Sequence, residues 1–371
     1  MYFCTVVFKK IPLDSMKRVV GFVCWFLFAH FSLLAQDFQW KAGLNYFFDN
    51  TEYAKSTLTK DQTMTGVHFS SEIGMAWDSV HRIYVGTDLL KTSGSQNIID
   101  AIHPIAYYQY KTSKTNFYAG AFPRTEILSN YSDLFFQDSI SYYRPTLQGI
   151  FWQQGNPNSF FNLWVDWTGH QTALNRETFF IGASAHKKLG YYFTDFQSYM
   201  FHYANTNPSN PDFHVSDNVL AHLSFGIDYS NQSGLDTLLF AVGVLGGVER
   251  ERGPDQTYSP VGLVLRGNAE YSGFGSQNTL YIGSPRQLFY EKYGNEFYWN
   301  NPFLRSGFYL QSKWYLEVIR SRFVNGRLSM NLHFSEGKVM YEQVFTIKAS
   351  LNSLERNHAT IKPTLLARWF K

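Results

Sequence analysis

A long segment of alternating side chains follows the apolar N-terminal run of this chain. Between residues 38 and 48 every second position is apolar, and the apolar row is Phe38, Trp40, Ala42, Leu44, Tyr46 and Phe48. A period of two is typical of a β-strand with two unlike faces, not of a helix. Strands of soluble proteins average about 5–6 residues, whereas a strand that crosses a bilayer needs roughly 9–11. The segment is therefore predicted to be a membrane-spanning strand.

The same pattern recurs to the C-terminus and predicts sixteen strands. They are Phe38–Phe48, Thr65–Trp77, His81–Lys91, Ile102–Tyr110, Asn116–Phe122, Leu147–Gln154, Phe160–Thr168, Thr178–His186, Tyr191–Tyr203, Val219–Tyr229, Thr237–Val248, Val261–Tyr271, Gly273–Ser276 with Thr279–Gly283, Phe308–Val318, Arg327–Phe334 and Val339–Leu351. We expect an all-β fold, a closed antiparallel transmembrane β-barrel. Fourteen or eighteen strands are the alternatives, because Thr364–Phe370 also resembles a closing strand.

The composition fits this architecture. Hydrophobic residues make up 44% of the chain, aromatic residues 18% and charged residues only 16%, against about 25% charged in soluble domains. The mean hydropathy is nevertheless low, at -0.25. A barrel explains both values, because half of each strand faces a wet interior.

The N-terminal segment has the pattern of a secretory signal. Lys17 and Arg18 precede an apolar run that ends near Ala35, and a basic region before an apolar one is the arrangement that export requires. Met16 is an alternative start, and an uncleaved membrane anchor is the alternative to a signal. We expect residues 1–35 to be the signal peptide and residues 36–371 a single barrel domain.

Cysteine and charge exclude several function classes. Both cysteines, Cys4 and Cys24, lie in the predicted signal, so the remaining chain has no disulfide framework and no cysteine metal site. The remaining part has 28 basic and 28 acidic residues and therefore a net charge of zero. Such a chain has no overall positive potential that would attract nucleic acid. No histidine cluster has metal-ligand spacing, and we predict neither metal nor cofactor.

Ionisable residues mark the face of each strand that we expect to line the lumen. A Lys or Arg on the lipid side costs roughly 2–4 kcal/mol at mid-membrane, and in three late strands the charges share one face. A soluble sandwich with polar outer faces is the alternative, but its strands would be shorter. The predicted pore-lining residues are Arg266, Glu270, Lys313, Glu317, Glu342 and Lys348.

Short and long connections alternate along the chain, and aromatic residues stand at many strand ends. With the C-terminal Leu365-Leu366-Ala367-Arg368-Trp369-Phe370-Lys371, this architecture resembles the porin-like outer-membrane barrels of Gram-negative bacteria. The trailing Lys371 departs from the usual terminal aromatic. The resemblance implies an outer-membrane location, contact with outer-membrane lipid, insertion by the barrel assembly machinery and, commonly, passive transport.

Two long loops, residues 123–145 and 284–305, are rich in aromatic and charged residues. Aromatic faces beside charged hydrogen-bonding groups suit sugar stacking or a constriction folded into the pore. The alternative is that the rings pack the loop onto the barrel mouth. The predicted ligand contacts are Tyr290, Tyr293, Tyr298, Trp299, Arg286 and Arg305.

Two His-x-Ser pairs, His68/Ser70 and His333/Ser335, raise the question of an enzyme. They resemble the pair that the outer-membrane phospholipases use for acyl transfer. The strand pattern, however, turns both pairs toward the lumen, whereas a lipid hydrolase needs them within reach of the bilayer. We therefore predict no catalytic residue and no enzyme. The expected function is a channel for passive uptake of small hydrophilic solutes, with glycan-derived solutes as a candidate. A non-conducting surface-binding or assembly scaffold is the alternative, and an outer-membrane lipid hydrolase comes third.

Overall fold

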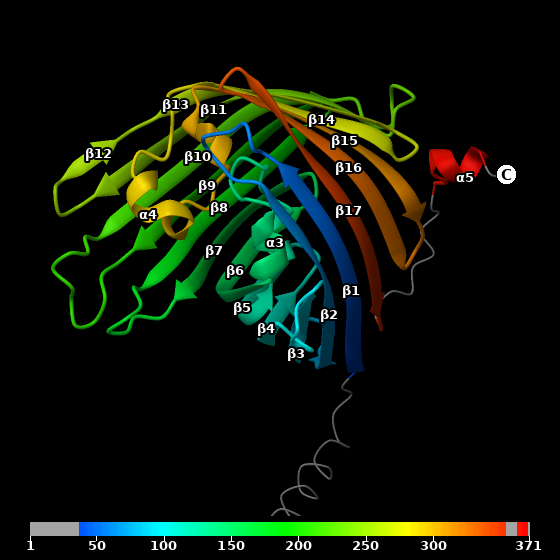
Figure 1. Ribbon diagram of the computed structural model, residues 1–371. Coiled ribbons are helices and arrows are strands. Elements are labelled where there is room, and N and C mark those ends of the chain that lie inside the picture. Colours follow the sequence, from blue (N-terminus) through cyan, green and yellow to red (C-terminus); the bar gives the residue numbers. More distant parts are fainter. Residues whose placement is uncertain (1–36, 354–361, 370–371) are drawn as a thin grey trace, which may run out of the picture.

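The computed structural model describes residues 37–353 and 362–369 of the chain (Figure 1). The predicted signal, residues 1–35, lies outside this part and stays a prediction, and so do both cysteines. The strands are β1 (Asp37–Glu52), β2 (Gln62–Trp77), β3 (His81–Thr92), β4 (Ala101–Lys111), β5 (Thr115–Pro123), β6 (Thr146–Asn156), β7 (Ser159–Gly169), β8 (Thr178–Leu189), β9 (Tyr192–Tyr203), β10 (Ser216–Asp228), β11 (Thr237–Glu251), β12 (Gln256–Tyr258), β13 (Val261–Tyr271), β14 (Phe274–Gly283), β15 (Phe308–Arg320), β16 (Val324–Ser335) and β17 (Lys338–Asn352).

The strands form one closed antiparallel barrel. Neighbouring strands pair in chain order, and β1 pairs with β17, with Ala42 opposite Leu351 and Phe48 opposite Phe345. The sheet counts 17 strands, but β12 is a three-residue extension on β11, which itself pairs directly with β13. Sixteen strands therefore make the wall, and the prediction of an all-β barrel of about sixteen strands is confirmed.

The C-terminal segment does not close the barrel. The residues predicted as an extra strand, Thr364–Phe370, instead include the short helix α5 (Leu365–Trp369); Phe370 lies outside the described residues. The alternative of a closing strand there does not hold, because β1 and β17 already satisfy each other's backbone groups and a closed barrel has no free edge. Among the helices of the described residues, none is both long and apolar enough to cross a membrane.

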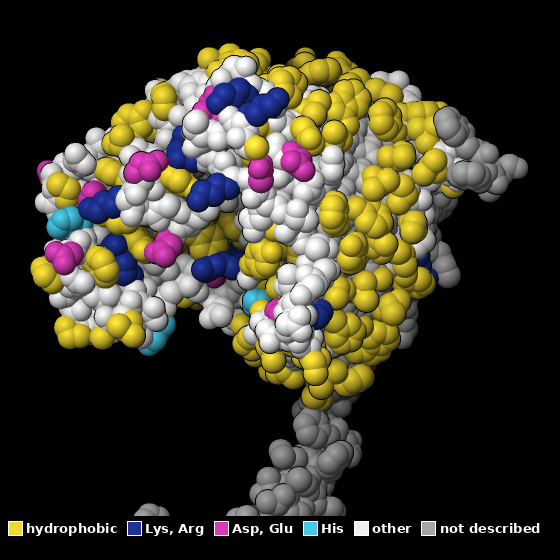
Figure 2. Space-filling view, viewed as in Figure 1, with side chains coloured by type: hydrophobic (Ala, Val, Ile, Leu, Met, Phe, Trp, Pro, Cys, Tyr) yellow, Lys and Arg dark blue, Asp and Glu magenta, His cyan; other side chains and the backbone are white. Residues whose placement is uncertain are grey.

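The outer face of the wall is apolar. Alternating side chains such as Phe69 and Ile73 of β2 and Phe225 of β10 are exposed on it, and Figure 2 shows hydrophobic side chains covering the wall over β1, β16 and β17. A lipid-facing surface needs this coat because hydrocarbon solvates no polar group. The chain spans the outer membrane with the geometry that the alternation predicts.

Connections at one end of the barrel have two or three residues, except the eight-residue one between β10 and β11. Those at the other end have eight or more, except the two-residue one between β16 and β17. In bacterial barrels the short turns are periplasmic and the long loops extracellular. Two of the long loops, residues 124–145 and 284–307, fold back into the barrel. They carry α2 (Thr125–Leu128) and α3 (Ser139–Tyr143) in the first and α4 (Tyr290–Phe297) with the 3-10 helix η1 (Pro302–Arg305) in the second.

The lumen holds the aromatic core of the molecule. Buried rings of the two inserted loops, including Phe135, Phe297 and Trp299, pack against inward rings of the wall such as Phe180 and Tyr199. The loops also bond to each other: the Gln137 N–H donates to the Trp299 carbonyl at 2.9 Å, and the Asn301 N–H to the Leu134 carbonyl at 3.2 Å. The two loops therefore form one plug under the extracellular opening.

Candidate functional site

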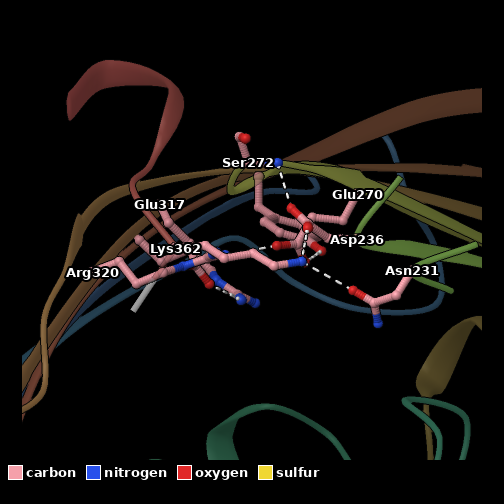
Figure 3. A network of polar contacts seen from close by, with 9 residues as sticks. Asn231, Asp236, Glu270, Ser272, Glu317, Arg320 and Lys362 are labelled. Carbon is pink, nitrogen blue, oxygen red and sulfur yellow. Dashed lines mark hydrogen bonds and ion pairs between the residues drawn. The ribbon is translucent and has the colours of Figure 1, made fainter. Parts of the chain in front are cut away.

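The predicted pore-lining charges lie on the inner face, and most of them are paired. At the periplasmic end Glu270 and Glu317 both bind Arg320, with Glu270 at 2.7 Å (Figure 3). Glu317 also accepts from Arg327 at 2.7 Å. The same corner holds the C-terminal segment, because Lys362 binds Asp236 at 2.7 Å. These residues form a structural ion-pair network.

The remaining pore-lining candidates lie higher in the lumen. Arg266 pairs with Asp195 at 3.0 Å, Lys313 reaches Asp133 of the first inserted loop at 2.8 Å, and Glu342 and Lys348 lie on the inner row of β17. Pairing with a loop residue means that Lys313 anchors the plug. The role of the six pore-lining candidates in conduction stays a prediction.

The six predicted loop contacts separate into two groups. Arg286 is buried and donates to the carbonyls of Leu245, at 2.5 Å, and Pro260, at 3.2 Å. Tyr298 is fully buried and donates to Glu249. These two hold the second loop in place. The residues that face open space or lie beside it are Tyr290, Tyr293, Trp299 and Arg305, with the Arg305 guanidinium 3.6 Å from the centre of the Tyr290 ring.

A cavity of about 1050 Å³ opens on the extracellular side, between the plug and the loops 170–177 and 204–215. We call it the vestibule. The side chains that give it its character are Tyr143, Arg144, Arg176, Phe213, Tyr293 and Trp299. Three of the predicted ligand contacts, Tyr293, Tyr298 and Trp299, line this cavity, although the Tyr298 side chain is fully buried.

Both His-x-Ser pairs face the lumen, as the strand pattern predicts. His68 is buried with its Nδ1 2.6 Å from Asp88. His333 has both ring nitrogens occupied, by the Tyr309 hydroxyl at 2.8 Å and the Tyr53 hydroxyl at 3.2 Å. A small pocket beside His333, which we call the luminal pocket, is also lined by Asp49, Asp138 and Glu342.

A different His–Asp pair lies on the outer face of the wall. His202 of β9 stands opposite Asp217 of β10, with Nδ1 and Oδ1 2.7 Å apart. The flanking side chains of His202, Phe201 and Tyr203, are buried in the luminal core, so alternation turns the imidazole outward. Both partners lie at the extracellular ends of their strands, on the side of the outer leaflet.

Charged and aromatic side chains surround this pair. The Arg252 Nε donates to the second oxygen of Asp217 at 2.9 Å. The Phe179 ring lies 4.8 Å from the imidazole, and Trp167, which is 49% exposed, lies 5.7 Å beyond it. The contact with Asp217 fixes Nδ1 of the imidazole, so Nε2 is left to exchange a proton with a molecule at the membrane surface. We call His202, Asp217 and Arg252 the outer triad.

The sequence analysis missed the outer triad for a reason that the structure explains. It ended one loop at Asp217 and assigned Arg252 to another, whereas β10 begins at Ser216 and β11 extends to Glu251. The available signal was a histidine on the lipid-facing row of Tyr191–Tyr203, next to Met200 on the same face. A titratable side chain on that row is costly unless it is paired, which points to a partner on the next strand.

Solved structures with similar folds are porins. OmpT of Vibrio cholerae has a TM-score of 0.54 at 5% identity, and the match covers 85% of this chain and 98% of that one. An anion-selective porin from Comamonas acidovorans has a TM-score of 0.50 at 8% identity, covering 85% and 99%. At such identities the likeness shows the fold alone, an outer-membrane barrel. No curated protein matches the sequence.

A family model gives a more specific result. The model described as lipid A 3'-O-deacylase-type matches residues 35–355, which is most of the chain. The family is named for an enzyme, so this match contradicts the prediction that the protein is not one. The inward direction of the two His-x-Ser pairs argues against those two histidines alone and does not exclude catalysis elsewhere on the chain. The chain belongs to the lipid A 3'-O-deacylase-type family.

Proposed function

We propose that this protein is an outer-membrane esterase that removes an ester-linked acyl chain from a lipid A-type glycolipid of the outer leaflet. The family match supports the reaction class. The observation that carries the proposal is the outer triad, because an acyl ester in the membrane meets the wall from outside. Two further His–Asp pairs of the described residues, His68–Asp88 and His186–Asp195, lie on inward rows of the wall.

The proposed reaction is a general-base hydrolysis. Asp217 holds Nδ1 of His202 as the protonated nitrogen, so Nε2 accepts a proton from a water molecule. The resulting hydroxide adds to the ester carbonyl, and the tetrahedral intermediate collapses with release of the sugar oxygen. That oxygen takes the proton from the imidazolium, and the products are a free fatty acid and a sugar hydroxyl. The neighbours of His202 across the sheet, Phe179 and Asp217, offer no hydroxyl, so we assign the attack to water.

The surroundings of the outer triad suit a glycolipid. The Trp167 and Phe179 rings offer an apolar surface along which an acyl chain can lie. Arg250 and Arg252 carry positive charge at the level where a phosphorylated headgroup sits, and guanidinium groups bind phosphate in a planar, bidentate way. Among the described residues Arg250 pairs with the exposed Asp255 alone, at 3.0 Å, and a phosphate would displace this carboxylate at little cost.

The experiment measures fatty acid released from lipid A in mixed micelles by the purified protein. His202→Ala is expected to reduce the rate by about 100-fold or more, the range for loss of a general base. His186→Ala is the matched control, because it removes a histidine from a similar carboxylate pair on the luminal side of the wall. Loss of activity in His333→Ala or Asp49→Asn, with His202→Ala fully active, would move the reaction to the luminal pocket. An inactive wild type would overturn the proposed function.

Passive uptake of small hydrophilic solutes, including glycan-derived ones, is the second candidate. The vestibule favours it, since it offers rings and guanidinium groups to a solute from outside. The plug opposes it, because the two inserted loops fill the lumen with packed aromatic side chains. Steady ohmic openings in planar bilayers would support a channel. A silent, folded protein without esterase activity would leave the surface-binding scaffold.

A further inference from the structure

The vestibule is lined by Arg144, Arg176 and Lys292 and by Asp212 and Glu296, which leaves a small excess of positive charge. The Arg144 side chain is exposed to the cavity, with its guanidinium 4.6 Å from the centre of the Trp299 ring. Arg176 donates to the Ala204 carbonyl at 2.6 Å and to that of His214, which are neutral acceptors. Within the described residues neither guanidinium forms an ion pair. In Figure 2, Lys and Arg side chains, with Asp and Glu side chains between them, surround a hollow on the face that carries α4.

Aromatic rings lie beside these charges. The Arg176 guanidinium is 3.7 Å from the centre of the Tyr203 ring and 5.1 Å from that of Phe213. Tyr143 is also exposed to the cavity. Cation–π contact leaves the in-plane N–H groups of a guanidinium directed sideways, available to an acceptor in the cavity. The vestibule thus presents flat apolar faces and charged donors to the same space.

We propose that the vestibule binds an anionic saccharide, whose sugar rings lie against the aromatic faces and whose phosphate or carboxylate meets Arg144. An acyl chain does not fit this site, since it offers nothing to two guanidinium groups that lack carboxylate partners. The volume, at about 1050 Å³, is at the upper end for small-ligand sites and suits an oligosaccharide. This site is distinct from the outer triad, which lies on the opposite face of β9, and it goes beyond the proposed esterase function.

Two sources could supply this ligand: a free acidic saccharide from outside the cell, or the saccharide part of a glycolipid. Calorimetric titration of the full chain in detergent distinguishes them. One arm uses trigalacturonate with neutral maltotriose as its control, and the other uses the lipid-free, phosphorylated saccharide released from lipopolysaccharide by hydrolysis. Binding in the first arm indicates the free source, and binding in the second alone indicates the glycolipid.

The decisive variant is Arg144→Gln, which we expect to weaken binding at least tenfold because a charge-assisted hydrogen bond is lost. Arg144→Lys should restore part of the affinity. Arg322→Gln is the matched control, because it removes the same charge, also beside an aromatic ring, from the periplasmic turn between β15 and β16, and it should bind as the wild type does. For the wild type alone, affinity should fall as salt rises. Binding of maltotriose as tight as that of trigalacturonate, no binding in either arm, or unchanged binding by a folded Arg144→Gln would each overturn the proposal.

Discussion

The buried ion pair between Arg124 and Asp166 holds the first inserted loop in the lumen, and Asp166→Asn tests that role. The two side chains are 4% and 1% exposed. Arg124 donates to Asp166 at 2.5 Å and to the carbonyls of Arg144, at 2.8 Å, and Thr146, at 2.9 Å. Asp166 also accepts the Gln148 N–H at 2.9 Å. The pair therefore joins the loop's first residue to its last ones and to the wall.

The free-energy cost of Asp166→Asn follows from the burial of the pair. Removing one partner of a buried pair costs about 3–5 kcal/mol, because the other charge stays buried without compensation. Two carbonyls still accept from Arg124 in Asp166→Asn, so we expect the lower end, about 3 kcal/mol. The hydrogen bonds between strands are unaffected, so the lost free energy destabilises only the docked state of the loop. At about 1.4 kcal/mol for each tenfold change, the undocked state becomes roughly 100-fold more populated.

Hydrogen exchange in micelles measures this change. Amides of the loop that are bonded within it, such as those of Ile127 and Phe135, should exchange roughly 100-fold faster in Asp166→Asn, while amides of β1 and β17 keep wild-type rates. The double variant Arg124→Met/Asp166→Leu should restore most of the protection, since an apolar pair replaces the ionic one. Wild-type exchange throughout the loop in Asp166→Asn would refute the assignment of this pair as its anchor.

Three further predictions concern pH, catalysis and the C-terminal segment. Desolvation and the charge of Glu342 raise the pKa of Asp138 from 3.8 to about 7. A raised pKa favours the protonated form in the docked state, so docking of α3 should weaken as pH rises from about 4 to about 7 and change little above that. Limited proteolysis of the loop should show this in the wild type but not in Asp138→Asn. Asp217→Asn should lower the rate of fatty acid release by about 10²–10⁴-fold with little change in KM, because Asp217 orients His202 without contacting the acyl chain; an unchanged kcat would count against the outer triad. Asp236→Asn removes the ion pair with Lys362, which is 59% exposed, and should change the free energy of unfolding by less than about 1 kcal/mol, as measured by urea titration; a larger loss would mean that the C-terminal segment is part of the barrel's stability.

Most of the wall could be predicted from the sequence because strand alternation is a local property. The one strand predicted in two pieces, β14, shows where this stops: Asn278 breaks the apolar row, yet its side chain accepts from Ser312 at 2.6 Å and donates to the Gly267 carbonyl at 3.3 Å. A polar side chain on the lipid face is tolerated when its neighbours satisfy it. Such cross-strand bonds depend on register, which the sequence of one strand does not contain.

The C-terminal segment and the candidate sites were harder to predict, because they too depend on contacts between segments that are distant in the sequence. Leu365–Trp369 is too short for its pattern to distinguish a helix from a strand. The aromatic content of the two long loops indicated a site, and the structure brings Tyr293 and Trp299 to the vestibule, but Arg286 and Tyr298 turn inward to hold the loop. Nothing local in the sequence says which rings pack the plug and which line the cavity.

The most direct test of the central claim, that this barrel hydrolyses a lipid ester at its outer wall, is the mass of lipid A from a Gram-negative host that produces the protein in its outer membrane. We predict that the wild type and His186→Ala shift the lipid A mass by the loss of one acyl chain, whereas His202→Ala at equal abundance leaves it unshifted. Lipid A of unchanged mass with the folded wild type, or an equal shift with His202→Ala, would contradict the account.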